Sequence, residues 1–167
     1  MIGGAWVDAA SGKTFDTYNP CTGDVLTRVA AGDKEDVYRA VMAARKAFES
    51  GRWASMNADD RGKLLWKLAD LLEANVVEFA HLEALDDGKL TGMTRFMDVP
   101  TAVQAFRYYA GPATKIQGRT MNLSVPYAPG TKFLAYSLKQ PVGFVGAIVP
   151  WNFPLMLATW RTSKWPG

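Results

Sequence analysis

The side chain that stands out as a candidate for chemistry is the amide of Asn152, in the segment P-W-N-F-P. The residues before it, 142–149 (V-G-F-V-G-A-I-V), form an apolar run typical of a strand that is covered on both faces. Pro150 ends such a strand because proline has no N–H to donate, and Pro154 suits the first position of a helix. The sequence therefore predicts a strand, a tight loop and a helix start. The Asn152 amide would lie at the carboxyl edge of a sheet, where open α/β sheets bind ligands.

Two other interpretations of this segment also follow from its residues. Residues 142–160 carry no charge and approach the length of a membrane span. Two prolines and an asparagine within that stretch would leave backbone groups unsatisfied in lipid, which favours a chain with no membrane contact. A buried strand and helix in which Asn152 has no function is also compatible with the spacing, and the pattern alone leaves that alternative open.

The segment P-V-G-F-V-G-A-I-V-P-W-N-F-P-L, residues 141–155, closely resembles the NAD(P)-dependent aldehyde dehydrogenases. The resemblance implies an α/β fold in which this chain is the helix-rich N-terminal part of a Rossmann-like cofactor domain with an oligomerisation hairpin. It also implies that Asn152 is a catalytic residue that helps to form an oxyanion hole. The positions implied to line the cofactor, NAD or NADP, are Ile148, Val149, Pro150 and Trp151.

Two further segments carry the same resemblance. Residues 2–20 are similar to the family's N-terminal strands, and L-E-A-L-D-D-G-K-L at residues 82–90 resembles L-E-x-x-D-x-G-K-P, with Leu90 in place of the proline. On this basis we divide the chain into three parts. Residues 1–122 belong to the cofactor-binding domain, residues 123–141 form the oligomerisation hairpin, and residues 142–167 supply the first strand and helix start of the cofactor sheet.

The family oxidises an aldehyde to a carboxylic acid. A thiolate attacks the substrate, hydride passes to the nicotinamide, and a glutamate activates the water that releases the acid. The resemblance places this nucleophile and base beyond residue 167 and fails after about residue 161, which suggests a truncated or frame-shifted reading frame. The chain is thus either part of an aldehyde-oxidising homo-oligomer or a catalytically inactive product that acts at most as an oligomer-interaction partner.

Composition excludes several classes of function. The chain has 167 residues, of which 49% are hydrophobic and 21% charged, with a formal net charge of +3, as expected for a soluble globular protein. Basic and acidic residues alternate, which argues against nucleic-acid binding although the pI is near 9.0. Cys21, the one cysteine, lies in an N-P-C-T-G turn and has no partner for a disulfide, which favours the cytoplasm. His81 lacks a second ligand at helical spacing, so no metal site is expected.

Turn and cap signals predict the elements around this segment. Short strands are expected at residues 6–7, 14–18 and 25–29. One helix is expected from Asp33 to Gly51, and a second begins at Asn57 and carries a stripe of buried leucines. A third is expected from a capping box formed by Asn75 and Glu78 to the solvated acids before Gly88. A fourth is expected over residues 99–109. Two strands, residues 121–127 and 132–139, would flank an A-P-G turn.

Overall fold

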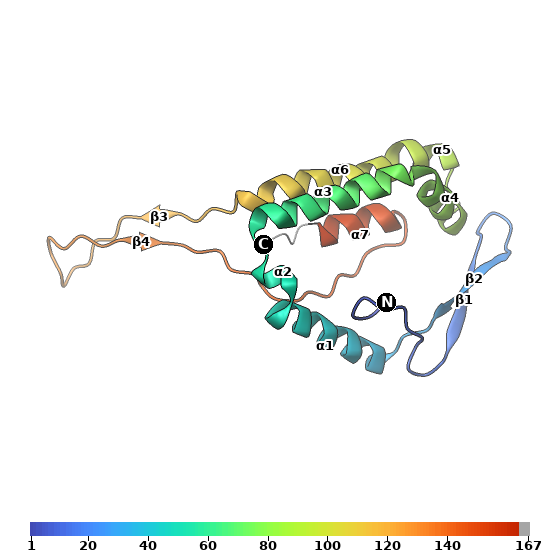
Figure 1. Ribbon diagram of the computed structural model, residues 1–167, viewed down its shortest axis with the longest axis horizontal. Coiled ribbons are helices and arrows are strands. Elements are labelled where there is room, and N and C mark those ends of the chain that lie inside the picture. The colour runs from blue at the N-terminus through green and yellow to red at the C-terminus, as the bar shows by residue number, and fades with distance from the viewer. Residues whose placement is uncertain (164–167) are drawn as a thin grey trace.

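The computed structural model describes residues 1–163. Its helices pack into an elongated body, a short two-stranded sheet lies at one end, and a long arm projects from the other (Figure 1). The elements in chain order are β1 (Thr14–Tyr18), β2 (Val25–Ala30), α1 (Lys34–Ser50), α2 (Arg52–Ser55), α3 (Ala58–Ala74), α4 (Val76–Asp87), α5 (Thr91–Met93), the π-helical turn η1 (Thr94–Asp98), α6 (Val99–Ala110), the 3₁₀ turn η2 (Gly111–Thr114), β3 (Thr120–Met121), β4 (Ala135–Tyr136) and α7 (Pro154–Thr162).

The strands predicted at residues 14–18 and 25–29 are present, and they form an antiparallel pair. Asp16 and Arg28 face each other across the pair, and their side chains form an exposed ion pair of 3.1 Å. The strand expected at residues 6–7 is absent, and the chain just before it turns through an isolated bridge between Ile2 and Ala5.

Local capping explains where the long helices begin and end. The Asp33 carboxylate accepts a hydrogen bond from the Glu35 N–H and starts α1, and the Asn57 side chain accepts one of 2.8 Å from the Asp60 N–H at the start of α3. Gly88 ends α4 in the left-handed conformation that glycine adopts at low cost. The capping box predicted for α4 is wrong: the Asn75 amide donates instead to the carbonyl of Leu71 in the preceding helix.

The hydrophobic core lies where α3 and α6 pack side by side, with α7 against α6 (Figure 1). Val99, Ala102, Val103 and Phe106 of α6 are buried, as the helical spacing predicts. Small residues let the two helices approach closely. A Cβ atom built on Gly62 of α3 would lie only 2.8 Å from the Ala110 carbonyl oxygen at the end of α6, so this position requires glycine unless a helix shifts.

The leucine stripe predicted for α3 is only partly buried. Leu65 and Leu72 belong to the core, whereas Leu64, Leu68 and Leu71 are about half exposed. The helical spacing of the leucines therefore predicted the helix correctly, but it overestimated how many of them are buried. Within residues 1–163 these three leucines keep about half of their surface accessible to solvent.

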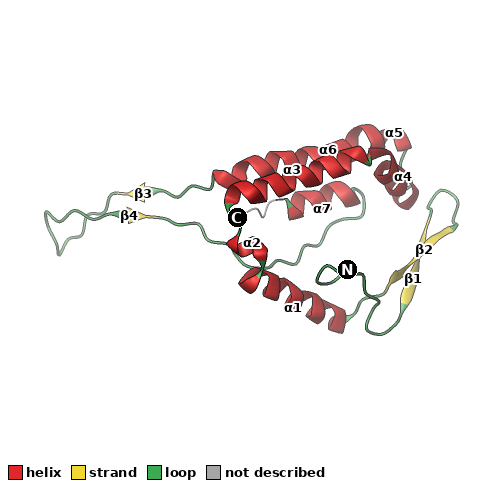
Figure 2. Cartoon of the chain, viewed as in Figure 1, coloured by secondary structure: helices red, strands yellow, loops and turns green. Residues whose placement is uncertain are grey.

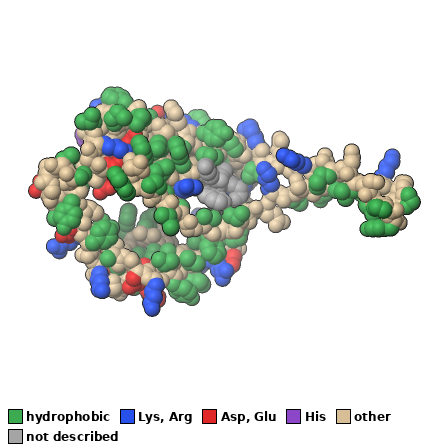
Figure 3. Space-filling view, turned by 180° about the vertical axis from the view of Figure 1, so that it is seen from behind, with side chains coloured by type: hydrophobic (Ala, Val, Ile, Leu, Met, Phe, Trp, Pro, Cys, Tyr) green, Lys and Arg blue, Asp and Glu red, His purple; other side chains and the backbone are tan. Residues whose placement is uncertain are grey.

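The predicted hairpin forms an arm that extends away from the helices (Figures 1 and 2). Its A-P-G turn is present, with Gly130 at a positive φ of 79° and the Ala128 N–H donating to Val125. Only two residues of each strand pair, β3 with β4, so the strands are much shorter than predicted. The side chains along the arm are exposed and in part hydrophobic (Figure 3).

The strand predicted at residues 142–149 is wrong for this chain. The segment runs as a loop from the arm to α7, and the part of the chain that the structure describes places no strand beside it (Figure 2). A parallel strand needs neighbours to satisfy its backbone groups and to cover its faces. Without them Val142, Val145 and Ile148 remain exposed.

Candidate functional site

The segment that carries Asn152 forms a tight loop directly before α7. Pro154 occupies the first turn of that helix, as predicted, and Phe153 precedes it at the cap position. The Asn152 residue is exposed, so its amide is free of the packed interior. The structure thus places this side chain beside the start of a helix that is anchored to the core through Leu155.

The predicted cofactor-lining residues form a largely exposed apolar surface beside Asn152. Ile148 is 95% and Trp151 79% exposed, Pro150 is exposed, and Val149 is half-buried. Exposed apolar side chains next to a polar amide fit one wall of a site for a planar, partly apolar cofactor. Of these four side chains only the Trp151 indole N–H can donate a hydrogen bond, so other residues would have to bind the phosphate groups of the cofactor.

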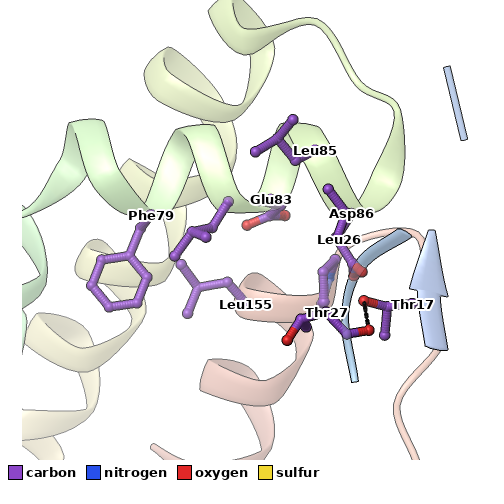
Figure 4. A pocket seen from close by; sticks show the side chains of 10 residues that line it. Thr17, Leu26, Thr27, Phe79, Glu83, Leu85, Asp86 and Leu155 are labelled. Atoms are coloured by element: carbon purple, nitrogen blue, oxygen red, sulfur yellow. Dashed lines mark hydrogen bonds between the residues drawn. The ribbon is translucent and has the colours of Figure 1, made fainter. Parts of the chain in front are cut away.

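A pocket of about 550 Å³ is lined in part by the start of the same helix (Figure 4). It is formed where the β1–β2 pair faces α4 and the first residues of α7, and its lining is mainly apolar. The side chains that line it include Leu26, Phe79, Leu82, Glu83 and Leu155. Glu83 is an ionisable side chain within this mainly apolar lining, and it is only 4% exposed.

Glu83 belongs to a buried group of charges that we call the Lys89 cluster, which consists of Glu83, Asp87, Lys89 and Asp98. The Lys89 Nζ atom lies 2.8 Å from the Asp98 Oδ2 atom, 3.0 Å from an Asp87 oxygen and 3.8 Å from a Glu83 oxygen. The three carboxyl side chains are at most 4% exposed. One ammonium group therefore compensates three carboxyl groups in a nearly dry environment.

The cluster shifts the pKa values of its members. Burial raises the pKa of Glu83 to about 7, and the negative charge of Asp98 adds to this effect while Lys89 opposes it. For Lys89, burial lowers the pKa, but the hydrogen bond to Asp98 and the close contact with Asp87 outweigh burial, so the net shift is upward. Lys89 is consequently charged at neutral pH, and Glu83 is the group that takes up a proton.

The ammonium group of Lys89 also contacts the candidate loop. Its Nζ atom lies 3.8 Å from the centre of the Phe153 ring, a cation–π contact with the residue that follows Asn152. The Lys89 cluster and the loop are thereby joined by a direct contact.

Sequence reasoning missed this cluster and was wrong about one of its members. Asp87 was expected to be a solvated acid at a helix end, yet its side chain is 3% exposed and pairs with Lys89. Its neighbour Asp86 is exposed, as expected. A signal was present: Glu83 and Asp87 follow the buried Ala80 by three and seven residues, which places all three on one face of α4.

The remaining candidates do not form sites. Cys21 is exposed, and its N–H donates to the Asn19 side chain within the predicted turn. His81 is exposed on α4, and within residues 1–163 no group of acidic, histidine and cysteine side chains is arranged to hold a metal ion. No helix in this part of the chain combines the length and apolar character needed to cross a membrane.

Comparison with known proteins decides the family. The model of the aldehyde dehydrogenase family matches residues 6–164. The chain belongs to the aldehyde dehydrogenase family. Phenylacetaldehyde dehydrogenase of Pseudomonas fluorescens is 48% identical over 163 residues, which cover 98% of this chain and 32% of that protein. Aldehyde dehydrogenase family 2 member C4 of Arabidopsis thaliana is 48% identical over 95% of this chain and 31% of its own length.

Solved aldehyde dehydrogenases share the fold. The NAD⁺ complex of the aldehyde dehydrogenase from Bacillus cereus superposes with a TM-score of 0.89 at 47% identity, covering 98% of this chain and 32% of that one. The α/β fold expected from the family resemblance is thus confirmed. The chain spans about a third of the length of the relatives that it matches.

Proposed function

We propose that this chain supplies the first part of the cofactor-binding domain and one oxyanion donor, Asn152, to an NAD(P)-dependent oxidation of an aldehyde to a carboxylic acid. The observation that carries the proposal is the exposed Asn152 amide in the loop before α7, within a chain of the aldehyde dehydrogenase family. An amide N–H held in a fixed direction stabilises negative charge that develops on a substrate oxygen, and it does so without a change in its own charge.

The residues beside Asn152 have a separate part in this proposal. The exposed apolar surface of Ile148, Val149, Pro150 and Trp151 would hold the cofactor, which accepts hydride from the substrate when bound. The related aldehyde dehydrogenase of Bacillus cereus is solved as an NAD⁺ complex and PnpE as a complex with nicotinamide adenine dinucleotide, which favours NAD for this chain. In this proposal the four side chains bind the cofactor and keep water away from it, and they take no part in proton transfer.

The same proposal assigns the remaining regions. Residues 1–122 would belong to the cofactor-binding domain, and residues 142–167 would continue it. The arm at residues 123–141 would pair with another subunit of a homo-oligomer, because its exposed apolar side chains and its largely unpaired backbone need a partner. A cytoplasmic location is proposed on the ground that the one cysteine is free and exposed.

The alternative is a catalytically inactive chain that acts at most as an oligomer-interaction partner. The observation that favours it is the exposure of apolar side chains on α1, α3 and the arm, the last of which is seen in Figure 3. Incubation of the 167-residue chain with NAD and an aldehyde distinguishes the two. We expect no NADH absorbance from this chain alone, because Cys21, its one cysteine, lies in an exposed turn on a different element from Asn152.

The role of Asn152 is best tested in a chimera in which residues 1–163 of this chain replace the matching third of the Bacillus cereus aldehyde dehydrogenase. We expect the chimera to oxidise aldehydes and Asn152→Ala to lower kcat by about 100- to 1,000-fold, the usual cost of one oxyanion donor, with NAD affinity nearly unchanged. The matched control is Gln104→Ala, which removes an exposed amide from α6 and should leave kcat as it was. Equal turnover of the Asn152→Ala and unsubstituted chimeras would refute the assignment.

A further inference from the structure

The Lys89 cluster brings four ionisable side chains together, three of them almost fully buried, at the end of one helix. Lys89 lies just beyond the end of α4, Glu83 and Asp87 come from α4 itself, and Asp98 ends the π-helical turn η1. Buried ion pairs contribute little net stability, because the loss of hydration offsets their attraction. Oxygens of Glu83, Asp87 and Asp98 are also left without hydrogen-bond partners within residues 1–163. Stability alone therefore does not account for the arrangement.

The geometry of Lys89 offers another account. Asp98 accepts a hydrogen bond from its ammonium group at 2.8 Å, and Asp87 lies at 3.0 Å, so two carboxylates on two different elements fix the position of the charge. An ammonium group carries three N–H bonds. Two further contacts complete its surroundings: a Glu83 oxygen 3.8 Å from Nζ, and the ring of Phe153, whose centre is also 3.8 Å away and well within the range of a cation–π interaction.

Phe153 is well placed to transmit that constraint. It is half-buried and follows directly on Asn152, whereas the residues before Asn152 have little support: Trp151 is 79% and Ile148 95% exposed. No side-chain cap fixes the start of α7. Within the described residues, the Lys89 contact thus ties the loop to the helical body at a point one residue from the proposed oxyanion donor.

We propose that Lys89 is a positioning residue of the reaction: its ammonium group holds the Phe153 ring and thereby fixes the loop that aims the Asn152 amide. Asp87 and Asp98 hold Lys89 in turn. The inference rests on the proposed function, since it concerns the orientation of Asn152. Lys89 itself touches neither substrate nor cofactor in this proposal.

The contact itself is tested in the 167-residue chain by NMR. A lysine side chain held over an aromatic ring has its ε-methylene protons shifted upfield by the ring current, and we expect this for Lys89. Phe153→Leu should abolish the upfield shift while the cluster stays intact. Lys63, whose exposed side chain pairs with Asp59 and Asp60 on α3, is the matched control and should show no such shift. An unshifted Lys89 would overturn the proposal.

The consequence for catalysis is tested in the chimera by a double-mutant cycle. We expect Lys89→Met and Phe153→Leu each to lower kcat by about 3- to 30-fold, the range of a desolvated cation–π contact, with NAD affinity unchanged. The double variant should be no slower than the slower single variant, because both remove the same contact. Lys89→Arg keeps the charge and should recover most of the loss. Phe153→Leu covers the case in which Lys89→Met, which leaves buried carboxylates unpaired, does not fold.

The outcomes separate this inference from the function on which it rests. Unchanged kcat in Asn152→Ala, or an inactive unsubstituted chimera, refutes the proposed function. A large loss in Asn152→Ala combined with unchanged kcat in Phe153→Leu, or with additive losses in the cycle, refutes the positioning role of Lys89 alone.

Discussion

Replacement of Glu83 by glutamine should change how the stability of the chain depends on pH. The Glu83 side chain is 4% exposed among apolar residues and two other acids, and burial raises its pKa from 4.5 to about 7. In the unfolded chain the carboxyl group ionises near 4.5, so between these two pH values the folded state binds a proton that the unfolded state has released. The neutral Glu83 carboxyl group therefore stabilises the folded state at low pH, and the free energy of unfolding decreases as the pH rises from 4.5 to about 7. Above about pH 7 this group causes no further change.

The size of the effect follows from the pKa shift. Each pKa unit corresponds to about 1.4 kcal/mol, so the shift from 4.5 to about 7 is equivalent to roughly 3 kcal/mol between the two ends of the window. Other carboxylates act in the opposite sense. Hydrogen bonding from the Asp33 N–H, together with the Ala10 N–H and Arg39, lowers the pKa of Asp36 against the effect of burial. The quantity to compare is therefore the difference between variant and unsubstituted chain, in which these contributions cancel.

Urea unfolding followed by circular dichroism at about pH 4 and about pH 8 measures that difference. We expect Glu83→Gln to gain about 3 kcal/mol relative to the unsubstituted chain on going from the lower to the higher pH, because glutamine has no charge to bury. Glu78→Gln, an exposed glutamate of the same helix, serves as the control and should show a constant difference. If the difference for Glu83→Gln is also constant, the carboxyl group is not desolvated as the structure indicates.

Two further predictions concern the helices that support the site. Gly62→Ala places a methyl group 2.8 Å from the Ala110 carbonyl oxygen. The overpacking should cost about 1–3 kcal/mol, which exceeds the gain of about 1 kcal/mol in helix propensity. Thermal denaturation should therefore occur at a lower temperature. Gly92→Ala, where no atom lies within 4 Å, should cause no such loss, and an equal loss in both would contradict the close approach of α3 and α6. Asn57→Ala removes the N-terminal cap of α3 and should cost about 1 kcal/mol in urea unfolding. Asn75→Ala removes no cap from α4, only an exposed hydrogen bond to the Leu71 carbonyl, and should cost less.

Features encoded by neighbouring residues were predictable from the sequence. The start of α1 at Asp33, the start of α3 at Asn57 and the end of α4 at Gly88 each depend on a side chain or a backbone angle within one helical turn. The burial of Val99 and Phe106 follows from helical periodicity. The P-W-N-F-P segment likewise led to the aldehyde dehydrogenase family, which the comparisons confirm.

Features that depend on distant residues were not predictable in the same way. The strand at residues 142–149 carries a strong strand pattern, but a strand forms only beside another strand, and residues 1–163 supply none there. The Lys89 cluster brings residues of α4, its following loop and η1 together, so no single window of sequence contains it. Asp87 was misread for this reason: a helix end beside glycine is normally solvated, and here α4 packs against η1.

These two failures lead to one physical interpretation of the site. The loop before α7 lacks the sheet that its sequence pattern requires, yet its end is held in place, because Phe153 rests on an ammonium group that two buried carboxylates fix. A cation–π contact persists without backbone pairing, since it needs only a ring and a charge at short range. The direction of the Asn152 amide would then depend less on the neighbouring strands than on a charge at the end of α4. If so, removal of the Lys89 charge should disturb the loop even where the remaining two thirds of an aldehyde dehydrogenase complete the sheet, and the double-mutant cycle in the chimera measures that directly.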